Sequence, residues 1–247
     1  MNKHQIFNHL METFQYIGGL NGSDITMPPD LSVISGYLSP VFNFVRFDTK
    51  NHAKINQLKS RNIPFMCLPS KQMEVDFEQF VQEQGLHNID LVTASFKDLQ
   101  NFEYTPSLLM KIRNIEKEDE LLIFDEISSQ VFSHHKMLAF NFLKPVLNSS
   151  KTHLLLAYVE EVPVGCAMLS LIGGEAGSYW IGVFPNFRNK GIGTELAKYQ
   201  MNMAKTLGKK IIVAHNMTPS LNLYQHLGFT QTGQLPLYAC DKQFFIF

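Results

Sequence analysis

Hydrophobic and polar positions in the second half of the chain repeat with two periods, one typical of strands and one typical of helices. Short apolar runs bounded by turn residues predict strands over 107–115, 153–159, 164–172, 176–184 and 210–215, and two more around 229–233 and 238–247. Apolar residues at helical spacing predict helices over 118–132, 134–147, 191–207 and 220–227. The pattern therefore indicates an α/β protein with helices between the strands of a mixed sheet.

The first half repeats the end of this order more faintly. The pattern predicts strands over 41–47, 64–69 and 89–96, and helices over 51–61 and 75–84. Gly85 ends the second of these helices, as Gly228 ends the last helix of the second half. We predict two lobes, 1–105 and 106–247, that join at 102–106. The alternative is that the first half is an unrelated α/β extension.

A glycine-rich turn with candidate chemistry separates the strand over 176–184 from the helix over 191–207. It reads Arg188-Asn189-Lys190-Gly191-Ile192-Gly193-Thr194. Unpaired N–H groups and the positive end of the helix dipole make such a helix start an anion site, and glycine lets a phosphate approach the main chain. The turn fits neither the P-loop nor the dinucleotide pattern. It predicts a site for a phosphorylated ligand, although similar turns also occur at ordinary strand–helix junctions.

A second segment, Leu223-Tyr224-Gln225-His226-Leu227-Gly228-Phe229, sharpens this prediction. Together with the R-x-x-G-x-G turn it resembles, in order, spacing and flanking elements, the acetyl-CoA motif and the L-Y-x-x-x-G-F signature of the GNAT superfamily of N-acetyltransferases. The resemblance covers about 107–247. It implies the GNAT acyl-CoA N-acyltransferase fold, acetyl-CoA as the acetyl donor, and direct transfer to a primary amine.

The corresponding turn of the first half lacks these features. It reads Phe47-Asp48-Thr49-Lys50-Asn51-His52, with no glycine to admit a phosphate and with an aspartate that would repel one. We interpret the first half as a degenerate GNAT-like lobe without cofactor, so that the whole chain would be a tandem of two GNAT-like lobes.

The resemblance also implies roles for single residues. Main-chain groups of Ile181, Gly182 and Val183 would pair with the pantetheine arm. The pyrophosphate would bind at Arg188, Asn189, Lys190, Gly191, Ile192, Gly193 and Thr194. Asn216 would be a further contact to coenzyme A, although it lies one residue farther from Tyr224 than the asparagine of the family. Tyr224 occupies the position of the catalytic tyrosine and is the candidate general acid; packing of the last helix is the alternative.

No general base and no metal site are predicted. Ser178 occupies the position at which many family members carry a carboxylate. Glu175 and His215 are weaker candidates, because one also fits a solvated turn and the other a hydrogen-bonded core histidine. His134 and His135 are adjacent, but no cysteine or carboxylate lies at ligand spacing, which favours a position on the helix surface and junction.

Composition and charge limit the classes of binding partner that the chain is expected to have. The formal net charge of −1, without a long run of like charge, argues against nucleic acid or an anionic membrane as the main partner. Cys67, Cys166 and Cys240 form no C-x-x-C pair and fit reduced thiols. No apolar stretch is long enough for a membrane span, and the start of the chain has no signal-peptide pattern. We expect a cytoplasmic protein that is a monomer or a homodimer.

Several functions stay open at this point. The acceptor amine could belong to a small molecule or to a protein. Some tandem GNAT-like proteins are peptidyltransferases that use aminoacyl-tRNA, but the intact R-x-x-G-x-G turn and the lack of a basic surface signal argue against that role. The non-enzymatic alternative is an acyl-CoA-binding sensor or interaction module.

Overall fold

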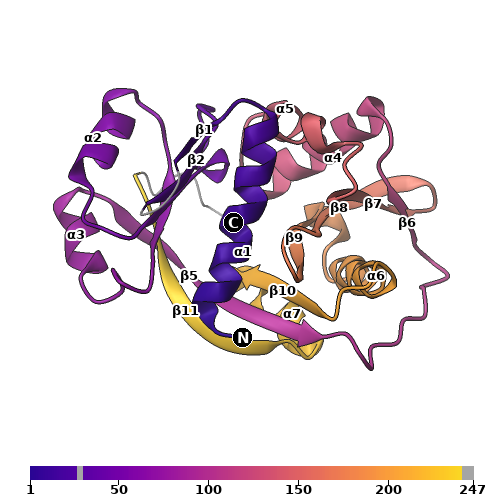
Figure 1. Ribbon diagram of the computed structural model, residues 1–247. Coiled ribbons are helices and arrows are strands. Elements are labelled where there is room, and N and C mark those ends of the chain that lie inside the picture. The colour runs from indigo at the N-terminus through magenta and orange to yellow at the C-terminus, as the bar shows by residue number, and fades with distance from the viewer. Residues whose placement is uncertain (27–29, 241–247) are drawn as a thin grey trace.

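Strands from both halves of the chain join one continuous mixed sheet in the computed structural model, which describes residues 1–26 and 30–240 (Figure 1). The strand order in the described sheet is β1-β2-β3-β4-β11-β5-β10-β9-β8-β7-β6. The strands are β1 (Asp24–Thr26), β2 (Leu31–Ile34), β3 (Asn43–Phe47), β4 (Met66–Pro69), β5 (His87–Asp98), β6 (Lys111–Asn114), β7 (Thr152–Val159), β8 (Val162–Ser170), β9 (Ala176–Val183), β10 (Ile211–Asn216) and β11 (Thr230–Ala239).

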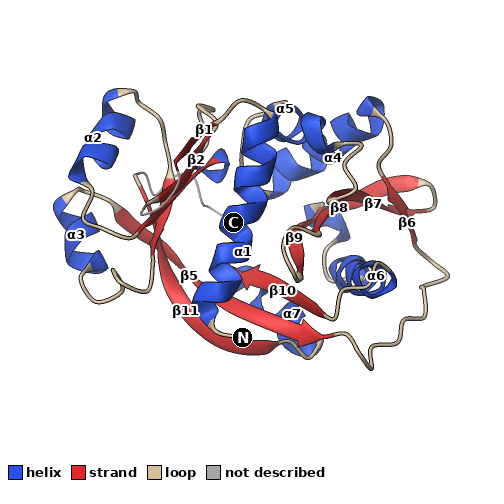
Figure 2. Cartoon of the chain, viewed as in Figure 1, coloured by secondary structure: helices blue, strands red, loops and turns tan. Residues whose placement is uncertain are grey.

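Helices flank this sheet in both lobes (Figure 2). The α-helices are α1 (Lys3–Leu20), α2 (His52–Ser60), α3 (Phe77–Glu83), α4 (Glu118–Val131), α5 (Leu138–Leu143), α6 (Ile192–Thr206) and α7 (Leu221–His226). Four 3-10 turns, at Pro40–Phe42, Lys144–Val146, Pro185–Phe187 and Thr218–Ser220, complete the described helical structure. None of the helices in the described ranges is long and apolar enough to cross a lipid bilayer.

The predicted repeat between the two halves is visible in the sheet. β3 runs parallel to β4 and is joined to it by α2, just as β9 runs parallel to β10 and is joined to it by α6. The helices predicted over 118–132, 191–207 and 220–227 are confirmed as α4, α6 and α7. The helix predicted over 134–147 is shorter, because Met137 has a positive φ of 70° and Pro145 falls in a 3-10 turn.

The end of the sheet differs from the prediction. Instead of two closing strands around 229–233 and 238–247, one strand, β11, runs from Thr230 to Ala239 with a register shift between Gln231 and Gly233. Residues 241–247 lie outside the described part of the chain. The place beside β10 is taken by β5 of the first half, which pairs with β10 on one edge and with β11 on the other.

The two lobes therefore exchange strands. β11 pairs with β5 along its length, and its end also pairs with β4 of the first half through Tyr238 and Ala239. The predicted boundary between 105 and 106 falls in the loop that connects β5 to β6. The lobes are consequently joined by main-chain hydrogen bonds as well as by this loop.

Helix α1 crosses between the lobes (Figure 1). Asn2 and Gln5 form a capping box at its start, which pairs main-chain N–H groups that the helix itself leaves free. One face of the helix is buried against β2, β5 and β10, and its buried apolar residues are Ile6, Phe7, Met11, Phe14 and Ile17. This bridging role of α1 is a finding of the structure.

An opening forms where β9 and β10 separate. The two strands pair only from Ala176 to Ser178 on the β9 side. Beyond Ser178 the register of β9 against β8 shifts, and Trp180 takes a φ of 59°, a conformation that bulky residues rarely adopt.

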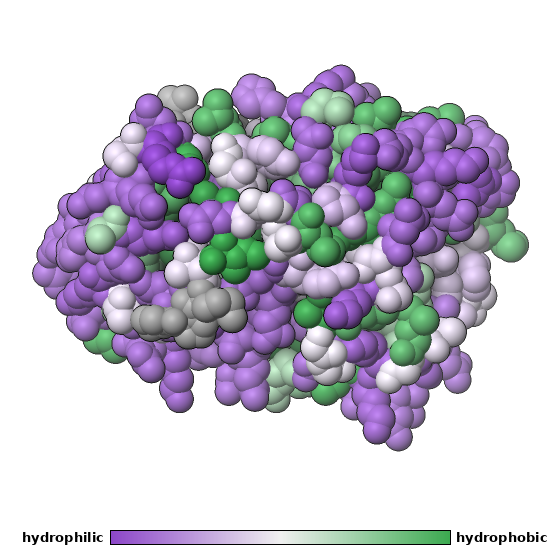
Figure 3. All heavy atoms as spheres, turned by 45° about the horizontal axis from the view of Figure 1, so that its top comes forward, coloured by the Kyte–Doolittle hydropathy of each residue, from purple (hydrophilic) through white to green (hydrophobic). Residues whose placement is uncertain are grey.

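The face of the molecule shown in Figure 3 is mostly hydrophilic, with smaller apolar areas near its centre.

Candidate active site

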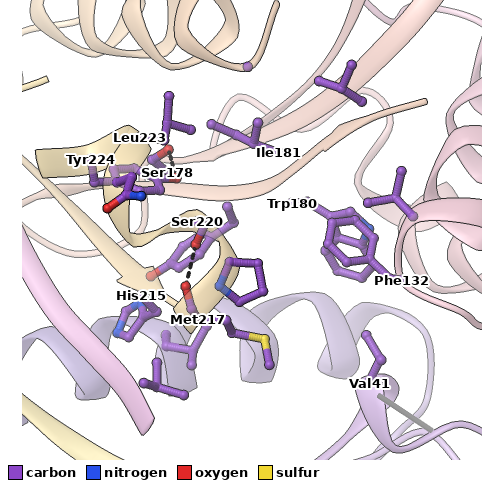
Figure 4. A pocket seen from close by; sticks show the side chains of 18 of the residues that line it. Val41, Phe132, Ser178, Trp180, Ile181, His215, Met217, Ser220, Leu223 and Tyr224 are labelled. Atoms are coloured by element: carbon purple, nitrogen blue, oxygen red, sulfur yellow. Dashed lines mark hydrogen bonds between the residues drawn. The ribbon is translucent and has the colours of Figure 1, made fainter. Parts of the chain in front are cut away.

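A cavity of about 710 Å³ occupies the opening between β9 and β10 (Figure 4). Both lobes line it. The second half contributes the glycine turn, β9, the end of α4, and the segment from β10 to α7, while the first half contributes α1, β3, β4 and β5. Figure 4 shows Trp180, Phe132 and Val41 at one end of the view and Ser178, Tyr224 and His215 at the other.

The glycine turn opens into this cavity with free donors. The main-chain N–H groups from Asn189 to Thr194 have no hydrogen-bond partner among residues 1–26 and 30–240. Gly191 caps α6 with a left-handed φ of 79°, a conformation that favours glycine. A Cβ on Gly193 would lie 3.8 Å from the nearest side chains, so the main chain there is open to a ligand. These donors and the dipole of α6 suit the phosphates of a nucleotide-like ligand.

The charged side chains of the turn stay near its surface. Nε of Arg188 donates to the carbonyl oxygen of Val183 at 3.3 Å, and Nζ of Lys190 lies 5.1 Å from the centre of the Phe187 ring. Both side chains are exposed, but only Arg188 lines the cavity. They add positive charge beside the free N–H groups.

The end of β9 presents a further donor. The N–H of Phe184 donates to Val164 of β8 at 3.0 Å. Because successive N–H groups of a strand point to opposite edges, the N–H of Val183 points away from β8, toward the side on which Arg188 contacts the Val183 carbonyl. Ile181 and Val183 line the cavity, whereas Gly182 packs against Cys166 and the end of α4.

Tyr224 reaches the cavity from α7 and is held by a buried hydrogen-bond chain. Oγ of Ser178 donates to Oε1 of Gln200 at 2.6 Å and lies 3.1 Å from the Tyr224 hydroxyl. Since the single Ser178 proton is given to Gln200, the Tyr224 hydroxyl is the donor to Ser178. Burial raises the pKa of Tyr224 to about 12, against a smaller lowering by the Ser178 hydrogen bond. The phenol therefore keeps its proton at neutral pH.

The candidate bases differ in their access to the cavity. His215 lines it, and its Nε2 donates to the carbonyl of Ile6 at 2.9 Å. Nδ1 then carries a lone pair and has no partner among the described residues. Burial lowers the pKa of His215 to about 3, so the ring is neutral. Glu175 lies at the other end of β9, beside His9, and does not line the cavity.

Two residues singled out in the sequence lie elsewhere. Asn216 is buried, and its Nδ2 donates to Ser95 of β5 at 2.6 Å, so its side chain joins β10 to β5 and does not line the cavity. His134 was expected at the helix surface, but it is buried, and its Nε2 lies 2.7 Å from Oγ of Ser128. Nδ1 of His134 contacts the carbonyl of His135. No cluster of three or more possible metal ligands occurs within the described ranges.

Trp180 of β9 is part of the cavity wall. Its Nε1 donates to Oγ of Ser128 at 2.7 Å, and Ser128 in turn contacts His134. Its ring lies parallel to Phe14 of α1, with centroids 6.2 Å apart, and edge-on to Phe132. These contacts hold an indole in a strained backbone position at the cavity wall. From the sequence, the strand around Ser178–Trp180 is expected to wall the cleft for the acceptor amine, and Trp180 is the sole tryptophan of the chain.

Comparisons with known proteins connect this chain to the acetyltransferase (GNAT) family and to structures with a similar fold. The model of the acetyltransferase (GNAT) family matches residues 109–229. A GCN5-related N-acetyltransferase from Kribbella flavida is 10% identical and has a TM-score of 0.68, with 93% of this chain and 94% of that chain covered. A GCN5-related N-acetyltransferase from Sphaerobacter thermophilus is 13% identical, with a TM-score of 0.64 and coverage of 85% of this chain and 75% of that one.

A third similar structure is that of a tandem protein. A tandem GNAT protein from the clavulanic acid biosynthesis pathway, solved without AcCoA, is 12% identical and has a TM-score of 0.58, with 96% of this chain and 94% of that chain covered. A search among proteins of curated function found no match to the sequence. At these identities the structural likeness establishes the fold, a mixed α/β GNAT fold.

Proposed function

We propose that this chain, which belongs to the GNAT superfamily of acetyltransferases through residues 109–229, transfers an acetyl group from acetyl-CoA to a primary amine. The observation that carries the proposal is that the free N–H groups of the glycine turn and the protonated Tyr224 hydroxyl face one cavity. The first suits a pyrophosphate, and the second suits a departing thiolate.

Acetyl-CoA would bind along the end of β9 and the start of α6. The main-chain N–H groups from Asn189 to Thr194 would hold the pyrophosphate, with added charge from Arg188 and Lys190. The pantetheine arm would run beside Ile181, Gly182 and Val183. The free N–H of Val183 would then be the donor that polarises the acetyl carbonyl, as in an oxyanion hole. Asn216 has no part in this proposal, since its side chain is committed to Ser95.

The transfer needs no covalent enzyme intermediate. The lone pair of the neutral amine attacks the thioester carbonyl carbon and forms the C–N bond. The electron pair of the C–S bond then passes to sulfur, and Tyr224 protonates the thiolate to give coenzyme A. The nitrogen loses one proton to solvent, and Tyr224 recovers one proton from solvent, so that the protons balance. A phenol whose pKa is about 12 regains its proton readily at neutral pH.

Ser178 and Gln200 would position the acid. In the resting structure the phenolic hydrogen of Tyr224 points to Ser178, whose own hydrogen is given to Gln200. To reach the sulfur, the phenolic hydrogen turns away from Ser178 while the oxygen stays in place. The residue at the family's carboxylate position therefore supports the acid and does not act as a base.

Calorimetric titration with acetyl-CoA tests the donor half of the proposal. We expect micromolar binding, about −8 kcal/mol, that the double variant Gly191→Asp/Gly193→Asp loses because two carboxylates would repel the phosphates. Gly208→Asp is the matched control, since Gly208 has a similar positive φ at the other end of α6 and open space around it. Wild-type protein that does not bind acetyl-CoA would refute the proposal. Binding without turnover on any amine would favour an acyl-CoA sensor or interaction module.

A further inference from the structure

The wall of the cavity that comes from the first half of the chain is entirely apolar. It consists of side chains from α1, β3, β4 and β5, together with Val41 of the 3-10 turn Pro40–Phe42. Phe14, Phe44, Met66, Leu68 and Val92 are among these residues, and Leu237 of β11 adds an apolar side chain from the second half. With Trp180 and Phe132 from the second half, they form a hydrocarbon surface beside the acetyl-transfer site.

The charge of the cavity is as informative as its apolar character. Among the described residues that line it, none is an aspartate, a glutamate or a lysine, and Arg188 of the glycine turn is the one permanent charge. A polyamine or an aminosugar with several ammonium groups needs carboxylates to replace the water that it loses, because an unpaired buried charge is costly. This cavity offers no such partner.

We propose that the acceptor is a monoamine whose single primary amino group is joined to an apolar, ring-containing body, and that the first lobe binds this body. The proposal rests on the proposed acetyl transfer and specifies its second substrate. The hydrocarbon part would pack on Phe14, Phe44 and Trp180, where aromatic rings prefer edge or offset contacts. The amino group would face Tyr224 and the glycine turn.

The same surroundings account for how the amine becomes a nucleophile. An ammonium that enters an apolar cavity loses hydration, and this desolvation lowers its pKa. The amine therefore binds neutral and leaves its proton in solvent, so no carboxylate base is required at the position of Ser178.

Fluorescence of Trp180 provides a direct binding test. Because Trp180 is the only tryptophan and lines the cavity, its emission reports on ligands there. We would titrate 2-phenylethylamine and 1,4-diaminobutane into the free protein and into protein saturated with coenzyme A. We expect saturable binding of 2-phenylethylamine with a Kd at least about tenfold below that of 1,4-diaminobutane, a difference of about 1.4 kcal/mol.

A pair of variants separates the cavity from the general surface. Val41→Asp places a carboxylate in the apolar wall. It should raise the Kd for 2-phenylethylamine at least about tenfold relative to the Kd for 1,4-diaminobutane. Leu38→Asp changes a residue of the same loop that is 64% exposed and outside the cavity, and should leave both affinities unchanged. Equal or tighter binding of 1,4-diaminobutane by the wild type, or no saturable change with 2-phenylethylamine, would overturn the inference.

The acetyl-transfer proposal has a separate readout. Release of coenzyme A from acetyl-CoA is followed with both amines. Transfer to the diamine without binding of 2-phenylethylamine would refute the substrate class and leave the transferase function standing. Binding of 2-phenylethylamine without release of coenzyme A in the presence of either amine would contradict the transferase function and leave the apolar amine site standing.

Discussion

The hydroxyl of Tyr224 lies 3.1 Å from Oγ of Ser178, in a chain that ends at the buried amide of Gln200. Three elements, α7, β9 and α6, each contribute one member of this chain. The phenol is thus fixed in a protonated state at the edge of the cavity. This relationship makes the role of Tyr224 open to test by single substitutions.

Replacement of Tyr224 by phenylalanine should abolish proton delivery to the thiolate while keeping the ring in place. We expect kcat for acetyl transfer to fall about 10²- to 10⁴-fold, the range typical of a general acid, with little change in the Kd for acetyl-CoA. Steady-state kinetics and calorimetry measure the two quantities. Tyr16→Phe, which removes a hydroxyl bonded to Ser149 outside the cavity, is the matched control. An unchanged kcat would leave Tyr224 with a packing role only.

Removal of the Ser178 hydroxyl should reduce stability. In Ser178→Ala, Oε1 of the fully buried Gln200 loses its donor, and an unsatisfied buried acceptor costs about 1–3 kcal/mol of unfolding free energy. Urea denaturation measures this loss. Ser149→Ala removes a hydroxyl in a half-buried position and should cost less. A Ser178→Ala variant as stable as the wild type would show that the chain from Tyr224 to Gln200 contributes nothing to the fold.

Gly193→Ala separates ligand binding from stability. A methyl group at this position would meet no atom closer than 3.8 Å, and alanine favours a helix by up to about 1 kcal/mol over glycine. We expect a Tm equal to or above that of the wild type. Affinity for acetyl-CoA should fall about tenfold, because the methyl group hinders approach to the main chain. A variant that binds acetyl-CoA as the wild type does would remove Gly193 from the phosphate site.

Acid should destabilise the protein before its carboxylates titrate. Burial lowers the pKa of His9, His134, His153 and His215 below the ordinary value of 6.5, and that of His215 to about 3. Below about pH 6.5 the unfolded chain therefore binds more protons than the folded chain. The contribution of the neutral histidines to the free energy of unfolding is fully present above that pH and is lost as the pH falls. His215 alone should account for about 2 kcal/mol between pH 7.5 and pH 5.

Urea unfolding at these two pH values measures the acid effect. His215→Gln should flatten the dependence, whereas replacement of the exposed His87 by glutamine should not. A wild-type unfolding free energy that is equal at pH 7.5 and pH 5 would contradict the burial of neutral histidines.

Local sequence patterns predicted the parts of the site that are local in the chain. The strand–turn–helix from Ala176 to Thr206 was predicted almost to the residue, because its apolar periodicity and its glycines lie within one short segment. That Tyr224 would lie near the same site was implied by the resemblance of the segment 223–229 to the GNAT signature. The residues within each of these elements are enough to predict its secondary structure, and tertiary packing determines only how the elements lie relative to one another.

The remaining features depend on contacts between distant segments. Asn216 follows the family spacing closely enough to suggest a ligand contact, yet Ser95, far away in the first half, takes its amide. His134 is buried because Phe42, far away in the first half, packs edge-on against its ring, while the nearby Ser128 takes its Nε2. The insertion of β5 beside β10 has no signal in periodicity, because a strand that is buried in one sheet has the same pattern whichever neighbours it has.

The exchange of β5 and β11 between the lobes has a consequence for how the chain reaches its native state. β5 emerges early in synthesis, but both of its neighbours, β10 and β11, are made only near the end of the chain. Pairings between such distant segments give a high contact order and slow folding. Until they form, β5 is an unpaired edge on which other chains can aggregate. The newly made first half is therefore the segment most exposed to aggregation until the second half has been made.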